Sequence, residues 1–170
     1  VIITEELSAG CSGMSTTLMV NDLALYPVVI AGTPEQKERF LRPFTQSAKL
    51  ASFCLTEPGA GSDVAGLSTT LKKEGDGYLL NGQKMFITNA NYSSQFTVYA
   101  TMDPNLKHKG LCAVVVDAKT AGVSIGKKEN KMGQRASDTA AVHFDNVRIP
   151  KENLLGRPGE GFKIAMKTLD

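Results

Sequence analysis

The sequence predicts an α+β fold, with helices first, then a sandwich-like or barrel-like domain of about eight antiparallel strands, then the start of a further helix. Three observations support this. Helix start and stop signals fill roughly the first fifty residues, the apolar period falls to two from about Leu50, and a helical period returns after Gly161. Strands and helices do not alternate along the chain, which argues against a Rossmann nucleotide-binding fold.

The first part of the chain reads as a series of helices. The opening helix is expected to end near Gly10, and a second to cover about residues 13–25 until Pro27 interrupts it. Thr33-Pro34-Glu35-Gln36 combines a capping Thr, a Pro at the first helical position and a Gln three residues after the cap. We expect that helix to run to about Leu41, where the following Arg-Pro closes it.

The middle of the chain reads as strands. Eight segments show strand character, at residues 50–55, 68–74, 78–80, 83–88, 95–101, 111–117, 123–126 and 139–144. Asn81-Gly82 is a strong hairpin signal, and Gly75-Asp76-Gly77 marks another turn. The polar stretch from Met102 to Gly110 is expected to be an exposed loop. Short strands with frequent turns favour a small sandwich or barrel.

The last residues predict an amphipathic helix. Phe162, Ala165, Met166 and Leu169 recur at the spacing of one helix face. A helix that begins in the final ten residues needs more chain to pack against, and the first residues read as the end of a helix already under way. We therefore expect the chain to be a segment of a larger protein.

Composition excludes several classes of function. A chain that is 42% hydrophobic and 21% charged suits a folded soluble protein, and a net charge of +2 implies no strong attraction to nucleic acid. The apolar runs are shorter than a membrane span. Three cysteines without a CxxC motif argue against a disulfide framework or zinc site, so we expect buried thiols in a reducing compartment. The two histidines lack metal-ligand spacing.

The stretch with the clearest chemical potential runs from Phe53 to Asp63, in the order Phe-Cys-Leu-Thr-Glu-Pro-Gly-Ala-Gly-Ser-Asp. Its two glycines allow a ligand to approach bare backbone, and successive N–H groups in such a turn can bind an anion. Thr56 and Ser62 add hydroxyls. A loop of this kind can hold a planar heteroaromatic edge at one end and a phosphate at the other. The plainer interpretation is a tight turn between two strands.

Four motifs in order carry a family resemblance. They are Thr-Glu-Pro-Gly-Ala-Gly-Ser-Asp at 56–63, Asn-Gly-Gln-Lys-Met-Phe-Ile-Thr-Asn at 81–89, Met-Gly-Gln-Arg-Ala-Ser-Asp-Thr at 132–139 with Phe-Asp-Asn-Val-Arg-Ile-Pro at 144–150, and Gly-Glu-Gly-Phe at 159–162. Together they cover nearly the whole chain. The sequence resembles the acyl-CoA dehydrogenase family, and within it the medium-chain and short-chain enzymes.

The resemblance implies an architecture and a reaction. Residues 1–49 would be the end of an N-terminal helical domain, residues 50–157 a middle β-domain of two packed sheets, and residues 158–170 the start of a C-terminal helical domain. Such enzymes oxidise acyl-CoA to trans-2-enoyl-CoA, with removal of an α-proton and hydride transfer from the β-carbon to FAD. Electrons then pass to an electron-transferring flavoprotein. The resemblance further implies a homotetramer in the bacterial cytoplasm or the mitochondrial matrix.

The resemblance also implies site residues. The FAD-binding positions are Phe53, Leu55, Thr56, Gly61, Ser62, Phe86, Ile87 and Thr88. Ser62 would also contact the CoA chain of the substrate, and Thr88 would approach the flavin N5. Phe86 stands where the family often has Trp, which keeps an aromatic wall and loses the indole N–H.

Three charged residues near these motifs are expected to have structural rather than catalytic roles. Glu57 is interpreted as a carboxylate that orders its loop rather than as a base. Arg135 and Asp138 are interpreted as an ion pair or part of a turn.

No catalytic residue is assigned within the chain, because the resemblance places the catalytic base in the C-terminal domain, beyond residue 170. We therefore expect the chain alone to lack dehydrogenase activity and to bind FAD weakly or not at all. Two alternatives stay open for its function. One is another flavin enzyme on the same scaffold, such as an acyl-CoA oxidase or a nitroalkane oxidase. The other is a non-catalytic binding or structural module. Acyl chain length is not set by these motifs.

Overall fold

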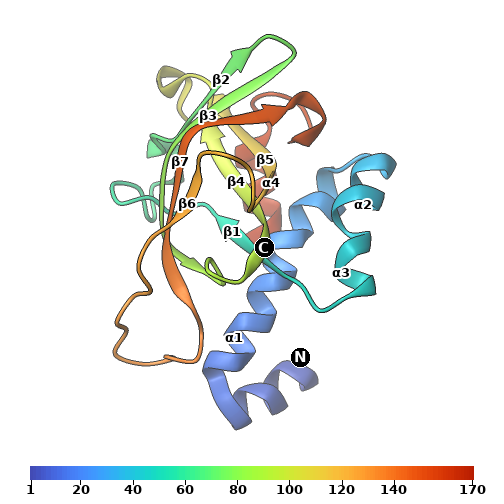
Figure 1. The fold of residues 1–170 in the computed structure, drawn as a ribbon, viewed down its shortest axis with the longest axis vertical. Helices are drawn as coiled ribbons and strands as arrows, with labels where there is room; N and C mark the ends of the chain where they lie inside the picture. Colours follow the sequence, from blue (N-terminus) through green and yellow to red (C-terminus); the bar gives the residue numbers. More distant parts are fainter.

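A computed structural model describes residues 1–170, and its elements follow the predicted order (Figure 1). Helices α1 (Ile2–Ala31), α2 (Pro34–Phe40) and α3 (Arg42–Gln46) precede the strands, and α4 (Gly161–Leu169) follows them. The strands are β1 (Leu50–Cys54), β2 (Thr70–Glu74), β3 (Gly77–Thr88), β4 (Ser93–Thr101), β5 (Leu111–Asp117), β6 (Val123–Ile125), β7 (Thr139–Pro150) and β8 (Leu154–Leu155). Short 3-10 turns lie at Val64–Gly66, Pro104–Gly110 and Lys151–Asn153. The α+β prediction and the number of strands are confirmed.

All eight strands belong to one folded sheet, rather than to the two separate sheets that the resemblance implied. The order is β6-β7-β3-β2-β4-β5-β8, with β1 paired in parallel to β4. Strands β2 and β4 share a single parallel pair, Thr70 with Thr101. That junction divides the sheet into a β3 half, made of β6, β7, β3 and β2, and a β4 half, made of β1, β4, β5 and β8.

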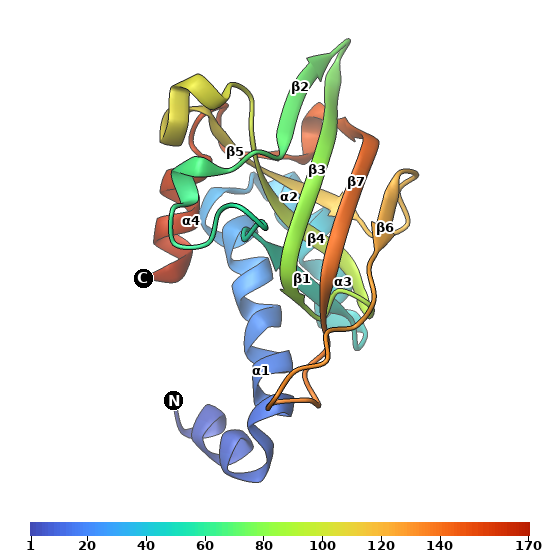
Figure 2. The same ribbon diagram turned by 90° about the vertical axis from the view of Figure 1, so that its left-hand side faces the viewer.

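Two hydrophobic cores follow from this folding. One lies between the two halves of the sheet and contains residues such as Leu80 and Val142 of the β3 half with Phe96 and Val114 of the β4 half. The other lies between the β4 half and the helices, and includes Val28 of α1. Figure 2 shows α1 and α4 on one side of the strands, with β7 and β6 on the other.

Helix α1 contains the predicted break but not the predicted end. Cys11 has an extended backbone (φ −160°, ψ 109°), so the helix kinks next to the expected boundary at Gly10. Pro27 lies inside the helix, which continues to Ala31. Pro27 removes a helical hydrogen bond, but Ala24 and Val28 on the same segment are fully buried, and this packing offsets the local loss.

Helix α1 is long and apolar enough by length and composition to cross a membrane, which the sequence analysis did not anticipate. Only 22% of its apolar window is buried here, and two hydrogen bonds join α1 to the strands. The hydroxyl of Thr97 donates to the carbonyl oxygen of Ala24 at 2.7 Å, and the amide of Asn89 donates to that of Thr17 at 2.9 Å. These bonds fix α1 against the strands.

The hairpin predicted at Asn81-Gly82 is wrong, because β3 runs through both residues. The chain reverses instead between Glu74 and Gly77, which are paired across β2 and β3. At Gly82 the register against β7 shifts and φ is +145°. A Cβ atom there would lie 2.6–2.8 Å from atoms of Thr69. The glycine therefore serves a β-bulge and a close approach of two chain segments rather than a turn.

The predicted start of α2 is confirmed by both hydrogen bonds of a capping box. The Gln36 N–H donates to the Thr33 hydroxyl at 3.2 Å, and the Thr33 N–H donates to the Gln36 side chain at 2.9 Å. The expected end of this helix near Leu41 is confirmed, because α2 ends at Phe40 with Leu41 as its C-cap; Pro43 then lies in the first turn of a separate helix, α3, which was not anticipated. Pro is compatible with that position because its missing N–H has no helical acceptor there.

The buried face of α4 differs from the predicted stripe. Gly161, Ile164, Ala165 and Thr168 are buried, whereas the Leu169 side chain is 52% exposed. The close contact between Gly161 and the backbone of Cys112 determines which face of α4 packs against β5.

The expectation of three buried thiols is wrong for one of them. Cys54 and Cys112 are buried, whereas Cys11 lies at the kink of α1 and is exposed.

Candidate functional site

The structure brings the Thr56 loop, residues 55–63, beside the second part of β3. The loop follows β1 in the β4 half, and β3 belongs to the other half. The Met85 N–H donates to the Thr56 carbonyl oxygen at 2.9 Å, and the Ser52 hydroxyl donates to the Thr88 carbonyl oxygen at 2.7 Å. Two segments that the sequence analysis assigned to one ligand therefore meet across the line between the halves.

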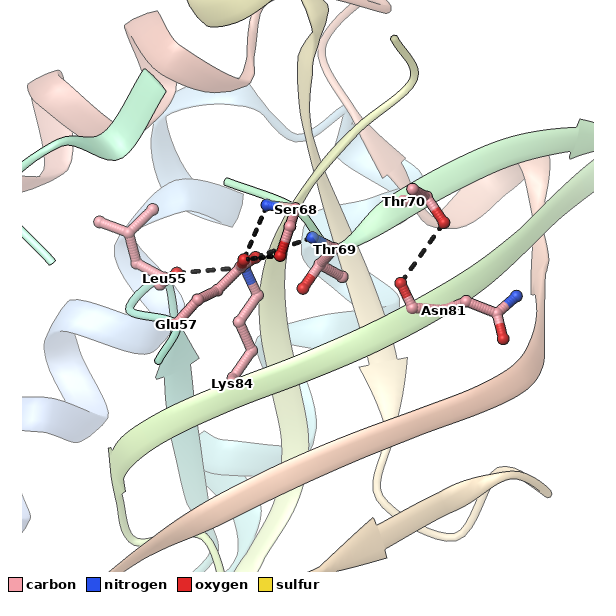
Figure 3. A network of polar contacts seen from close by, with 7 residues as sticks. All are labelled: Leu55, Glu57, Ser68, Thr69, Thr70, Asn81 and Lys84. Atoms are coloured by element: carbon pink, nitrogen blue, oxygen red, sulfur yellow. Dashed lines mark hydrogen bonds and ion pairs between the residues drawn. The ribbon is translucent and has the colours of Figure 1, made fainter. Parts of the chain in front are cut away.

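A buried ion pair lies beneath this meeting point (Figure 3). Lys84 Nζ is 2.7 Å from Glu57 Oε1 and donates to the Leu55 carbonyl oxygen at 3.1 Å. The Glu57 carboxylate also accepts the N–H and hydroxyl of Ser68 at 2.7 and 2.6 Å, and the N–H of Thr69 at 3.0 Å. This geometry confirms the interpretation of Glu57 as a loop-ordering carboxylate.

The charges of the pair are set by two opposing effects. Burial alone would raise the pKa of Glu57, but the Lys84 ammonium and the donors of Ser68 and Thr69 outweigh it and lower that pKa to about 2. Burial lowers the pKa of Lys84, and the Glu57 carboxylate opposes this shift. Glu57 is therefore ionised at neutral pH with four donors. A buried charge so fully paired fixes geometry, and loss of one partner is costly.

A second feature of the site is a bulge in β3 directly after Lys84. The register against β7 shifts between Lys84 and Ile87, and Phe86 has φ +57°. Positive φ is unusual for an aromatic residue, and such strain is concentrated at functional sites. The bulge leaves Phe86 61% exposed while Ile87 is 2% exposed in the core. An aromatic ring is thus presented outward next to the Thr56 loop.

The predicted FAD residues divide into supporting side chains and available polar groups. Phe53 packs against the ring of Tyr99 at a centroid distance of 5.1 Å, and Leu55 and Ile87 are buried. The backbone N–H groups of Leu55 and Thr56 donate to no backbone acceptor, and the Thr56 hydroxyl makes no hydrogen bond.

The glycine-rich end of the loop is open. A Cβ added at Gly59 or Gly61 would meet nothing within 4 Å, and Ser62 is exposed. The N–H groups of Gly61 and Ser62 donate to no backbone acceptor. Free donors at both ends of the loop fit a ligand with a polar ring edge and a phosphate, so the residues present are compatible with FAD.

The larger cavities lie away from this loop. One of about 430 Å³ lies between α1 and α3, and its lining includes Tyr26, Val29, Leu41 and Phe44. None of the predicted FAD residues lines the larger cavities. The free donors of the Thr56 loop and the exposed ring of Phe86 instead lie together on an open surface, above the buried Lys84–Glu57 pair.

Asp138 braces the turn after β3. Its carboxylate accepts the backbone N–H of Asn91 at 2.9 Å and the Asn91 side-chain amide at 3.0 Å. Arg135 lies 3.4 Å from the side-chain oxygen of Asn130 and forms no ion pair with Asp138. The other interpretation, part of a turn, holds, because Arg135 lies in the turn closed by the bond from the Ser137 N–H to the Gln134 carbonyl oxygen.

Comparisons with known proteins show the family of this chain. Residues 1–48 match the profile of the acyl-CoA dehydrogenase N-terminal domain, and residues 52–147 match that of the middle domain. This chain belongs to the acyl-CoA dehydrogenase family. The family consists of FAD-dependent oxidoreductases.

Relatives are similar along nearly all of the chain. It is 47% identical to the probable medium-chain specific acyl-CoA dehydrogenase 2, mitochondrial, of Caenorhabditis briggsae, covering 99% of this chain and 42% of the relative. It is 48% identical to the mitochondrial short-chain specific acyl-CoA dehydrogenase of Rattus norvegicus, covering 99% and 41%. The chain thus spans about two fifths of the length of these relatives.

Solved structures of acyl-CoA dehydrogenases share the fold. Butyryl-CoA dehydrogenase from Megasphaera elsdenii superimposes with a TM-score of 0.95 at 42% identity, over 98% of this chain and 44% of that one. An acyl-CoA dehydrogenase complexed with FAD from Bacillus anthracis superimposes with a TM-score of 0.86 at 39% identity, over 92% and 27%.

The structure gives Lys84 a role in the site that sequence reasoning did not assign. A lysine in an alternating strand is normally read as exposed. The available signal was its position four residues after Leu80 on a strand, which puts it on the inward face.

Proposed function

We propose that this chain forms the flavin-facing part of an FAD-dependent acyl-CoA dehydrogenase that converts an acyl-CoA to the trans-2-enoyl-CoA. The observation that carries the proposal is the convergence of the free donors of Leu55 and Thr56 with the exposed ring of Phe86, at the positions where family resemblance expects the flavin. The identity of 47–48% to curated family members over nearly the whole chain supports it.

Each predicted residue has a distinct part in the proposed site. The N–H groups of Leu55 and Thr56, with the Thr56 hydroxyl, bind the pyrimidine edge of the ring system. Phe86 forms a wall beside it, and Thr88 contributes its hydroxyl near N5. FAD, when bound, supplies the acceptor for the hydride that leaves the substrate β-carbon. Ile87 contributes through its backbone, because its side chain belongs to the core.

The rest of the loop serves the phosphate end and the substrate. The N–H groups of Gly61 and Ser62 face the pyrophosphate, and the Ser62 hydroxyl contacts the CoA chain. Phe53 supports the loop from below through its contact with Tyr99.

The proposed domain organisation is the one given by the resemblance, with boundaries near residues 49 and 157. The chain then contains the end of the N-terminal helical domain, the β-domain and the start of the C-terminal helical domain. The base that removes the α-proton lies outside these residues, so the chain alone has no dehydrogenase activity. The assembled enzyme is a homotetramer that passes electrons to an electron-transferring flavoprotein. Two relatives of the chain are named as mitochondrial enzymes, and a bacterial enzyme shares its fold. We therefore place the enzyme in the mitochondrial matrix or, in a bacterium, in the cytoplasm.

Flavin binding and substrate reduction test the proposal separately. The chain is mixed with FAD, excess is removed and the visible spectrum is recorded, beside the intact protein that contains it. We expect a bound, shifted flavin band in the intact protein and little in the chain alone. Anaerobic addition of butyryl-CoA or octanoyl-CoA should then bleach the flavin band and release the enoyl-CoA. Intact protein that retains no flavin refutes the proposal, and peroxide formation in air would indicate an oxidase instead.

A further inference from the structure

Lys84 occupies an unusual place in the sheet. Its side chain is fully buried, it belongs to the β3 half, and its ammonium donates to two groups of the Thr56 loop on the other side of the junction. An apolar side chain would suit the inward face of a strand at lower desolvation cost. A lysine held there with complete pairing therefore points to a geometric task.

The contacts of Lys84 and its neighbour determine which groups of the loop stay free. Lys84 binds the carbonyl oxygen of Leu55 and the carboxylate of Glu57, and the N–H of Met85 binds the carbonyl oxygen of Thr56. Two consecutive residues of β3 thus donate hydrogen bonds to acceptors on three consecutive residues of the loop. The N–H groups of Leu55 and Thr56 remain unbonded.

The same lysine precedes the β3 bulge. Phe86, with its positive φ and exposed ring, is two residues further along the strand. A strained residue persists only when its surroundings hold it in place. The bonds from Lys84 and Met85 to the loop supply such a restraint directly before the bulge.

We propose that Lys84 is a positioning residue for FAD, acting through the Thr56 loop. By holding the carbonyl oxygen of Leu55 and the Glu57 carboxylate, it orients the N–H donors toward the pyrimidine edge and sets their spacing from the ring of Phe86. This inference rests on the proposed function of the chain. It assigns Lys84 no contact with FAD or with the acyl-CoA.

The test uses the intact flavoprotein with the double substitution Lys84→Met, Glu57→Gln. The pair of changes leaves no unpaired buried charge, and the glutamine oxygen can still accept from Ser68 or Thr69. We expect FAD to dissociate about tenfold more readily, as for loss of one charged hydrogen bond. In the FAD-saturated variant the flavin band and reduction potential should shift and kcat should fall, while KM for acyl-CoA stays near the wild-type value.

Two control substitutions separate positioning from general stability and charge. Val147→Ala creates a cavity in the core between the two halves, at a β7 residue that pairs with Leu80 rather than with Lys84. Lys73→Met removes an exposed lysine from β2. Both should keep the wild-type flavin spectrum and potential. Glu57→Asp is a second test variant that keeps both charges, shortens the reach of the carboxylate and should shift the spectrum in the same direction.

The outcomes distinguish the two proposals. Intact wild-type protein without FAD or acyl-CoA oxidation refutes the proposed function and this inference with it. The role of Lys84 alone is overturned if the wild-type protein binds FAD and is active, but the double variant and the Glu57→Asp variant match Val147→Ala in spectrum, potential and kcat. Should the double variant fail to fold, Glu57→Asp decides by the same readouts.

Discussion

Replacing Gly82 with alanine should destabilise the protein far more than a surface glycine substitution. The added Cβ would lie 2.6 Å from the Thr69 hydroxyl oxygen, 2.7 Å from its Cα and 2.8 Å from its Cβ. Thr69 is fully buried, so it cannot move aside freely. The positive φ of +145° costs about 1–3 kcal/mol for a residue with a side chain, and the overlap a further 1–3 kcal/mol or so. The expected loss is therefore between about 2 and 6 kcal/mol, a large share of the 5–15 kcal/mol or so typical of a domain.

Urea denaturation followed by far-ultraviolet circular dichroism measures this loss. Gly75→Ala is the matched control, because Gly75 also has positive φ (+55°) but open space around its Cβ. It should lose only the conformational part, about 1–3 kcal/mol. Gly59→Ala has neither problem and should change stability by less than about 0.5 kcal/mol. Equal losses for Gly82→Ala and Gly75→Ala would show that the close approach to Thr69 is irrelevant and would refute the reasoning.

Three further outcomes follow from contacts described above. In the folded protein the pKa of Glu57 is lowered to about 2, so its ionised form contributes about 3 kcal/mol to stability. This contribution is present above pH 4.5 and is lost as the pH falls toward 2. The difference in unfolding free energy between wild type and Glu57→Gln should therefore shrink over that pH range. A constant difference would contradict the assignment. Thr33→Ala should cost about 1 kcal/mol in urea denaturation through loss of the N-cap, and no change would exclude the capping box as a contributor. A thiol reagent should modify Cys11 rapidly, but Cys54 and Cys112 only when the protein unfolds. Burial shields these two thiols and raises their pKa, which lowers the fraction of reactive thiolate. Fast reaction of all three cysteines in the native protein would disprove the burial pattern.

Local patterns predicted the elements well where one segment determines its own structure. The capping residues Thr33 and Gln36 bond as expected, and the helix break falls beside Gly10. The strand periods located seven of the eight strands, although they divided β3 into two segments and did not anticipate the two-residue strand β8. These features depend on neighbours in sequence, so the sequence carries them directly.

Features that depend on distant segments were harder to predict. Asn81-Gly82 has the composition of a hairpin turn, but Thr69 lies against Gly82 and β7 pairs along both sides of it, so a bulge forms instead. Pro27 stays helical because the sheet packs against its helix. Lys84 was missed because its partner, Glu57, lies 27 residues away in sequence. The composition of the Thr56 loop suggested a ligand, whereas its free donors became apparent only from the fold.

The strand ladder between the two halves of the sheet consists of the single Thr70–Thr101 pair, and the Lys84 and Met85 bonds to the Thr56 loop supplement it. An opening along this line breaks fewer ladder bonds than an opening of the continuous β4–β5 ladder. In hydrogen exchange, the amides of Met85 and Thr101, which cross or flank this line, should therefore exchange faster than those within β4 and β5. A ligand seated across the line would slow those amides first, because it ties the two halves together. Bound flavin would therefore make the protein more rigid, and the flavin-free protein would open more often along this line.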